Sequence, residues 1–191
     1  MRKLSSLLCT LALIAGGPAA AAGINIEGLA RTCNNCHGIN GVSVGQSMPS
    51  IGGLSEAYLK QVLMQWKSGE RFSASMGRLV KGYSDEELAA IAGYYARLPW
   101  VPVAQKTDAK LLAHGKDAVE RCVTCHGDTG SEPDDDVTPR LNGQWAKYME
   151  LELMKYRDDA VKMTHKKMRT NARKLDEEGL KSAPEFFASQ K

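Results

Sequence analysis

The chain has 191 residues, of which 43% are hydrophobic, so its length allows one or two small domains. Its 25 basic and 22 acidic side chains give a formal net charge of +3 and no RNA- or DNA-binding motif occurs, so we expect no nucleic-acid partner. Two domains of about 80 residues each would have thin cores, and small domains usually need a metal, a cofactor or disulfides for stability.

Residues 1–22 have the pattern of a secretory signal peptide. Arg2 and Lys3 precede an apolar run over residues 4–15, and small residues follow up to Ala22. The apolar run is too short to span a bilayer well. We therefore expect this segment to be removed and the mature chain, without a membrane span, to lie in a periplasm. An uncleaved membrane anchor is the alternative.

Helical periodicity dominates the next part of the chain, and no alternating strand pattern stands out. Apolar positions over residues 26–33 share one face of a first helix. Ser55 can cap a second helix, which carries an apolar stripe over residues 59–66. Ser84 and Glu87 form a capping box that opens a third helix.

The second part of the chain follows a seam at Pro99-Trp100-Val101-Pro102, where two prolines stop the preceding helix. Apolar periodicity predicts a helix that begins near residue 111 and runs into Cys122, and another helix over residues 145–157. The last helix has no clear start, because Gly179 and Pro184 interrupt its pattern.

The cysteines carry the strongest functional signal. Of the five in the chain, Cys9 lies in the signal segment. The other four occur in Cys33-Asn34-Asn35-Cys36-His37 and Cys122-Val123-Thr124-Cys125-His126. The pattern C-x-x-C-H is the attachment signature of c-type haem. Two thiols on one helical turn can bond the two vinyl groups of one porphyrin, and the adjacent histidine can then bind the iron. We expect two covalently bound haems c.

Three other interpretations of these cysteines exist. Two disulfides could form in an oxidising compartment. A thioredoxin-like redox pair needs only C-x-x-C and does not explain a histidine after both pairs. A zinc site shared by the two pairs is disfavoured because Cys33 and Cys122 are 89 residues apart, against roughly 15–20 in a zinc ribbon.

The two parts of the chain are copies of one unit. They align at an offset of about 90 residues. The matching positions are His37 with His126, Pro49 with Pro139, Tyr58 with Tyr148, Leu63 with Leu153, Met64 with Met154, and Trp66-Lys67 with Tyr156-Arg157. We therefore divide the chain into the signal peptide at 1–22, a first domain at 23–98, a linker at 99–107 and a second domain at 108–191.

The order of elements in each unit resembles the class I cytochrome c fold. We therefore expect an all-α protein with two tandem class I cytochrome c domains related by internal duplication. In that fold a proline carbonyl accepts the N–H of the iron-binding histidine, and such bonds fix the ring and tune the metal. The resemblance gives this role to Pro49 for His37 and to Pro139 for His126.

An electron carrier of this kind needs a second axial ligand, and a methionine thioether is the usual partner of histidine. Met76 lies 39 residues after His37 and just before the helix opened by Ser84. It is expected in a loop, where Gly77 and Gly82 would let the backbone approach a haem edge closely. Met76 is therefore the candidate for the first haem.

The second half offers two methionines and a histidine. Met168 lies eight residues before Asp176, and Met76 lies at the same distance before the capping serine of the first half. This symmetry favours Met168 over Met163. His165 stays an alternative, because an imidazole also ligates iron. Three other methionines lie in helical stripes and are expected to fill the core: Met64, Met149 and Met154.

Several short segments, taken in order, resemble the dihaem cytochrome subunit of flavocytochrome c sulfide dehydrogenase. They are Lys67-Ser68-Gly69-Glu70, Met76-Gly77-Arg78, Lys81-Gly82-Tyr83-Ser84, Gly143-Gln144-Trp145, Lys166-Lys167-Met168 and Phe187-Ala188-Ser189-Gln190. The resemblance implies that Met76 and Met168 are axial ligands. It also implies an FAD-containing flavoprotein partner, which oxidises sulfide, while the haems carry the electrons away singly to a soluble or membrane acceptor.

Two other functions compete with this one. The first is a free periplasmic dihaem shuttle between respiratory complexes. The second is a haem enzyme, such as a dihaem peroxidase or a thiosulfate dehydrogenase, which needs an open iron. A methionine available to each haem disfavours the enzyme, so we expect no catalysis by this chain alone. Trp100, at the seam, is either a partner contact or a residue packed between the halves.

Overall fold

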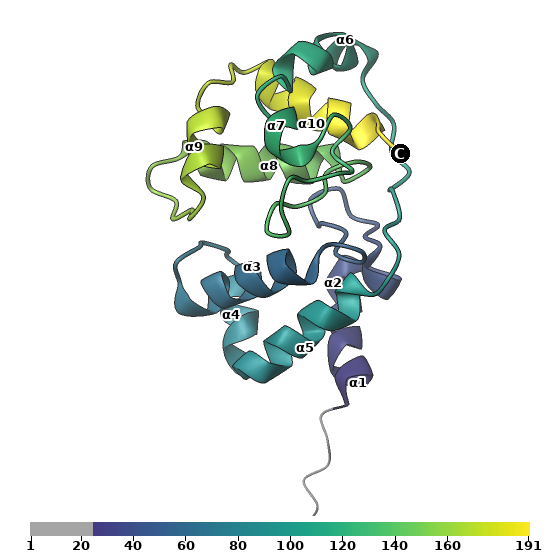
Figure 1. The fold of residues 1–191 in the computed structure, drawn as a ribbon, viewed down its shortest axis with the longest axis vertical. Coiled ribbons are helices and arrows are strands. Elements are labelled where there is room, and N and C mark those ends of the chain that lie inside the picture. Colours follow the sequence, from purple (N-terminus) through teal and green to yellow (C-terminus); the bar gives the residue numbers. More distant parts are fainter. Residues whose placement is uncertain (1–24) are drawn as a thin grey trace, which may run out of the picture.

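The structure is a computed structural model that describes residues 25–191, so the predicted signal peptide at 1–22 lies outside the described residues. The described part of the chain consists of helices joined by turns and loops, with no strand among them. Two helical lobes are stacked along the long axis of the molecule, and an extended linker runs along one side (Figure 1).

The first lobe contains five α-helices and two short 3₁₀ helices. They are α1 (Ile26–Arg31), α2 (Asn34–His37), η1 (Ile39–Gly41), α3 (Glu56–Ser68), α4 (Met76–Leu79), η2 (Val80–Gly82) and α5 (Asp85–Ala96). Both predicted caps are present. The Ser55 hydroxyl accepts the N–H of Tyr58 at the start of α3, and Ser84 and Glu87 form the capping box of α5.

The second lobe repeats the main helices of the first. It contains α6 (Ala109–Ala118), α7 (Val123–His126), α8 (Ala146–Arg157), α9 (Lys166–Ala172) and α10 (Gly179–Ser189). The start of the last helix, which the sequence left open, is at Gly179, and α10 continues through Pro184. Gly115 of α6 lets α10 approach closely: a Cβ there would lie 2.9 Å from Cβ of Phe186. This packing stabilises α10 despite the proline.

Each lobe has its own hydrophobic core. In the first lobe, Leu59, Leu88, Ile91 and Tyr95 are buried between α3 and α5. In the second lobe, α6, α8 and α10 enclose Val119, Met149, Ala183 and Phe187. The prediction that Met154 fills a core is wrong: its side chain is 50% exposed, on the outer face of α8, whereas its repeat mate Met64 packs against the first core. None of the helices in residues 25–191 has the length and apolar character needed to cross a bilayer.

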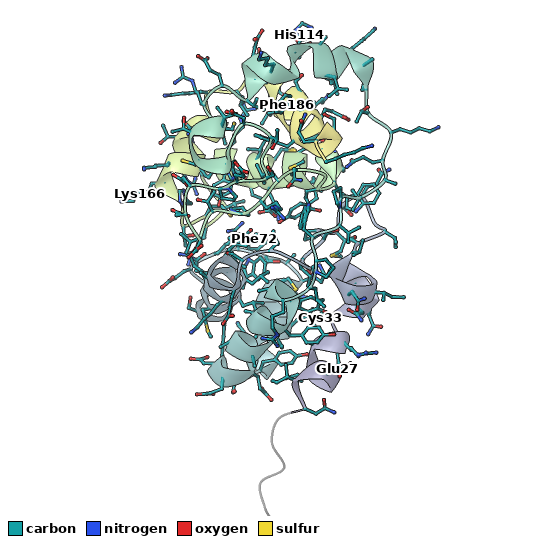
Figure 2. All side chains as sticks on the ribbon, turned by 45° about the vertical axis from the view of Figure 1, so that its right-hand side comes forward. Glu27, Cys33, Phe72, His114, Lys166 and Phe186 are labelled. Atoms are coloured by element: carbon teal, nitrogen blue, oxygen red, sulfur yellow. The ribbon has the colours of Figure 1, made fainter. Side chains whose placement is uncertain are left out.

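The lobes meet along a polar seam in which α3 faces α8 (Figure 1). The buried Gln144 side chain accepts the N–H of Ser50 at 3.0 Å and donates to the Ser50 carbonyl at 2.9 Å. The indole of Trp145 donates to the carbonyl of Ser43 at 3.2 Å. The backbone N–H of Phe72, which Figure 2 shows at the seam, donates to the carbonyl of Lys162 at 2.8 Å. These bonds hold the lobes in one arrangement.

Trp100 is part of this seam. Its indole N–H donates to the carbonyl of Asn142 at 2.9 Å, and the guanidinium of Arg140 lies 5.9 Å from its ring centre. The side chain also packs against the core of the first lobe. Trp100 therefore packs between the halves, as the second of its two interpretations predicted.

Replacing Gln144 should weaken the seam. We expect Gln144→Ala to lower the free energy of unfolding by about 2–3 kcal/mol, because it leaves the buried polar groups of Ser50 without partners. Urea unfolding of the holoprotein, followed by circular dichroism, measures the change. Gln46→Ala, at an exposed loop glutamine, is the matched control. Equal stability of the two variants would contradict the prediction.

Candidate functional site

The histidine of the first C-x-x-C-H motif is buried at the end of a short helix. His37 is 6% exposed and is the last residue of α2. Its Nδ1 atom lies 2.9 Å from the carbonyl oxygen of Pro49, which is the hydrogen bond that the sequence predicted. The chain then turns at Gly38, where φ is 77°. A Cβ at this glycine would lie 1.9 Å from the carbonyl oxygen of Val42, so the turn requires glycine.

The second motif repeats this geometry. His126 is 4% exposed at the end of α7, and its Nδ1 atom lies 2.9 Å from the carbonyl oxygen of Pro139. Gly127 follows with a φ of 78°. The same hydrogen bond from histidine to proline therefore occurs in both halves, which supports the internal duplication.

Both histidine rings have the tautomer and the protonation state that metal binding requires. A carbonyl oxygen can only accept, so each Nδ1 must carry the proton and each Nε2 keeps a free lone pair. Burial lowers the pKa of His37 and of His126 below the usual value. Each ring is thus neutral at pH 7, which is the form that ligates a metal.

The four motif cysteines are free thiols, and their environments do not suit a redox pair. Burial raises the pKa of Cys122 to about 11 and also raises the pKa of Cys33. Reactive redox cysteines have a lowered pKa, because the thiolate is the nucleophile. These environments therefore disfavour a thiol–disulfide exchange site at the two motifs.

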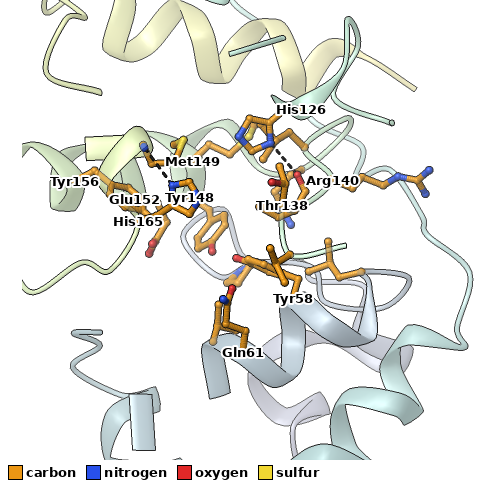
Figure 3. A pocket seen from close by; sticks show the side chains of 18 of the residues that line it. Tyr58, Gln61, His126, Thr138, Arg140, Tyr148, Met149, Glu152, Tyr156 and His165 are labelled. Carbon is orange, nitrogen blue, oxygen red and sulfur yellow. Dashed lines mark hydrogen bonds between the residues drawn. The ribbon is translucent and has the colours of Figure 1, made fainter. Parts of the chain in front are cut away.

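A single hollow adjoins both motifs and extends across the seam (Figure 3). It holds about 2000 Å³ of empty space, part of which is open to solvent, and its wall is mainly apolar. His37 and His126 line it from the two lobes, and Tyr58 and Tyr148, which are equivalent in the repeat, face it from opposite sides. A flat apolar group held by two thiols and an imidazole fits these walls, so the residues present suit a haem in each half.

The candidate sixth ligands also adjoin this hollow. Met76 is half-buried and lines it. The expectation that Met76 lies in a loop is wrong, because it is the first residue of α4, where its N–H donates to the hydroxyl of Ser73 at 3.1 Å. In the second lobe Met168 lines the hollow from α9, whereas Met163 is buried in a separate small cluster with Tyr156.

His165, the alternative ligand, also lines the hollow but has another role. It is exposed and caps α9, where its Nδ1 atom accepts the N–H of Met168 at 3.3 Å. A neutral ring with Nδ1 as acceptor carries its proton on Nε2 and has no further lone pair for a metal. This geometry favours Met168 as the candidate.

No protein-family profile matches the chain. Cytochrome c4 of Pseudomonas aeruginosa is 33% identical over 173 residues, which cover 82% of this chain and 82% of that protein. The chain belongs to the cytochrome c4 family. The members of this family are dihaem c-type cytochromes, and the chain is a dihaem electron-transfer protein.

Two other relatives have different descriptions. A thiosulfate dehydrogenase electron acceptor of Thiomonas intermedia is 30% identical over 169 residues, which cover 83% of this chain and 76% of that protein. The cytochrome subunit of sulfide dehydrogenase of Chlorobaculum tepidum is 43% identical over 72 residues, which cover 38% of this chain and 64% of that protein.

The fold agrees with membership of the cytochrome c4 family. The crystal structure of reduced recombinant cytochrome c4 from Pseudomonas stutzeri matches with a TM-score of 0.77 at 24% identity, over 87% of this chain and 97% of that chain. The predicted fold, two tandem class I cytochrome c domains, is confirmed.

Sequence reasoning missed a charged cluster in the hollow. Arg71 and Glu152 line it and form an ion pair across the seam. At the repeat offset of 90 residues, Arg71 corresponds to Val161 and Glu152 to Val62. A charge that replaces a valine in an otherwise similar repeat was the signal that could have identified the pair.

Gly38 offers a test of the motif geometry. We expect Gly38→Ala to reduce the fraction of purified protein that carries both haems, because a Cβ would collide with the Val42 carbonyl and displace the histidine. Intact mass spectrometry counts the haems on each chain. Gly45→Ala is the matched control, since a Cβ there would meet only Cβ of Met48, at an ordinary contact distance of 3.7 Å. Full double loading of Gly38→Ala would contradict the prediction.

Proposed function

We propose that this chain is the dihaem electron-transfer subunit of a periplasmic sulfide dehydrogenase. In this role it takes electrons from an FAD-containing partner subunit and passes them one at a time to a soluble or membrane acceptor. The observation that carries the proposal is the 43% identity to the cytochrome subunit of sulfide dehydrogenase, against 33% to cytochrome c4 of P. aeruginosa. The ordered segments that resemble this subunit support it in both halves of the chain.

Each half supplies one complete set of haem-binding residues under this proposal. When bound, haem c supplies a one-electron couple. The thiols would hold it covalently, the histidine and methionine would ligate its iron, and the proline carbonyl would fix the histidine ring. The proposed set is Cys33, Cys36, His37, Pro49 and Met76 in the first half, and Cys122, Cys125, His126, Pro139 and Met168 in the second.

The division of labour follows from electron counting. A reduced flavin holds two electrons, so two one-electron sites on one subunit can accept both in sequence. In this proposal a histidine and a methionine of the chain would ligate each iron, so neither iron would keep an open position where sulfide could bind. FAD is therefore expected only on the partner, and this subunit alone should not oxidise sulfide.

A free periplasmic dihaem shuttle is the second candidate. It is supported by the length of the match to cytochrome c4, which covers 82% of the chain, whereas the match to the sulfide dehydrogenase subunit covers 38%. The two functions need the same haem sites and differ in whether a flavoprotein is a stable partner.

Methionine replacements test the proposed axial ligands. We expect Met76→Ala and Met168→Ala each to remove part of the methionine–iron charge-transfer band and to lower one haem potential, because a thioether favours ferrous iron. Absorption spectra and redox titrations measure both changes. Met154→Ala, at an exposed methionine of α8, should change neither. If Met168→Ala leaves the spectrum intact and His165→Ala abolishes the low-spin signal, the second assignment is wrong.

Reconstitution tests the proposed partner. Sulfide should reduce the haems of this chain quickly when the exported flavoprotein of the same host is present, and slowly without it, because the two-electron step belongs to the flavin. Stopped-flow absorption measures the rates, with an unrelated flavoprotein as the control. Equal rates with and without the partner, or a native preparation without flavin, would favour the free shuttle.

A further inference from the structure

A buried guanidinium lies at the seam between the two lobes. The side chain of Arg71, just after α3, is 8% exposed. Its Nη2 atom donates to Oε2 of Glu152, on α8 of the other lobe, at 3.0 Å. Its guanidinium carbon lies 5.8 Å from the ring centre of Trp66 and 5.7 Å from that of Tyr156. One charge is thus held between an aromatic ring of each lobe.

Two N–H groups of this cluster lack a partner. The Nε of Arg71 and the Nε1 of Trp66 are buried and make no hydrogen bond to any of the described residues. Both side chains line the hollow that adjoins the two haem-binding motifs. Buried donors without partners are rare in native proteins, so each indicates an acceptor that belongs to the site.

The charges around these donors do not cancel. Glu152 accepts from Arg71 and also from Lys155 at 2.5 Å, so one carboxylate faces two cations and leaves a net charge of about +1. Burial raises the pKa of Tyr58 to about 12 and also raises the pKa of Tyr148 and of Tyr156, so the hydroxyls nearby are neutral. Arg71 is the buried cation of the three charges, whereas the side chain of Lys155 is 33% exposed. A buried cation with a free donor, in a cluster of net positive charge, matches one carboxylate of a ligand.

The Arg71–Glu152 ion pair is not part of what the two halves share. Arg71 corresponds to Val161 and Glu152 to Val62, so the equivalent positions in the two lobes hold two valines. Attachment of a haem in this fold therefore does not itself require the pair. Its place at the seam indicates a function that concerns both halves together.

We propose that Arg71 and Trp66 donate to a propionate carboxylate of a haem bound in this hollow, and that the Arg71–Glu152 pair sets the haem reduction potential from both lobes. This inference rests on the haem sites of the proposed function, and it adds residues outside the attachment motifs. Reduction adds negative charge to a haem. A buried cation therefore favours the reduced state, and a buried carboxylate opposes it.

The proposal predicts shifts of opposite sign for the two partners of one ion pair. Arg71→Gln should lower at least one haem potential by about 59 mV, which corresponds to a tenfold change in the one-electron equilibrium constant. Glu152→Gln should raise the same potential, because the cations then lack their carboxylate. Arg71→Lys keeps the charge and should retain most of the potential. Arg31→Gln, which breaks an exposed ion pair with Glu27, is the control and should shift neither haem.

The experiment is a spectroelectrochemical titration of each purified holoprotein, with the haem number of the same sample counted by intact mass. A purely structural role would overturn the proposal: Arg71→Gln and Glu152→Gln, which break the same contact, would then shift the potential in one direction or not at all. If the Arg71→Gln protein does not accumulate in the cell, the Glu152→Gln variant alone tests the proposal. Only a raised haem potential in Glu152→Gln then supports it. A wild-type chain without two haems would instead refute the proposed function.

Discussion

The hydrogen bond from each buried histidine to a proline carbonyl is the interaction on which the site geometry depends. It connects the short helix that carries the cysteines to the loop that leads to α3 in the first half and to α8 in the second. It also fixes the proton on Nδ1 and aims Nε2 into the hollow. The tight turns at Gly38 and Gly127 make this bond feasible, because they bring the loop back beneath the ring.

Duplication explains most of the molecule, but the seam is not symmetric. Tyr58 and Tyr148 are equivalent and face one hollow from opposite lobes. The bonds that join the lobes have no such counterpart: Gln144 binds Ser50, and Arg71 binds Glu152, whereas the equivalent residues do not form these pairs. The two halves therefore share their haem-binding geometry and differ in electrostatics, which allows two chemically identical cofactors to have different potentials.

The features that the sequence predicted correctly are local or repeated. The caps at Ser55 and Ser84 act within one turn of helix, and the all-α fold follows from periodicity. The features that it missed depend on tertiary contacts. Pro184 lies inside α10 because of packing across Gly115, and the Arg71–Glu152 pair joins residues 81 positions apart. No local pattern encodes such contacts.

The polar seam also bears on how fast electrons can pass within the molecule. Opening it would expose the bonds between Gln144 and Ser50 and the main-chain bond from Phe72 to Lys162, and would leave the Arg71 charge unpaired. These contacts oppose any movement of one lobe against the other, because opening the seam would remove all of them together. The fold thus favours one distance between the two haem-binding motifs, and that distance would limit how fast an electron passes from one half to the other.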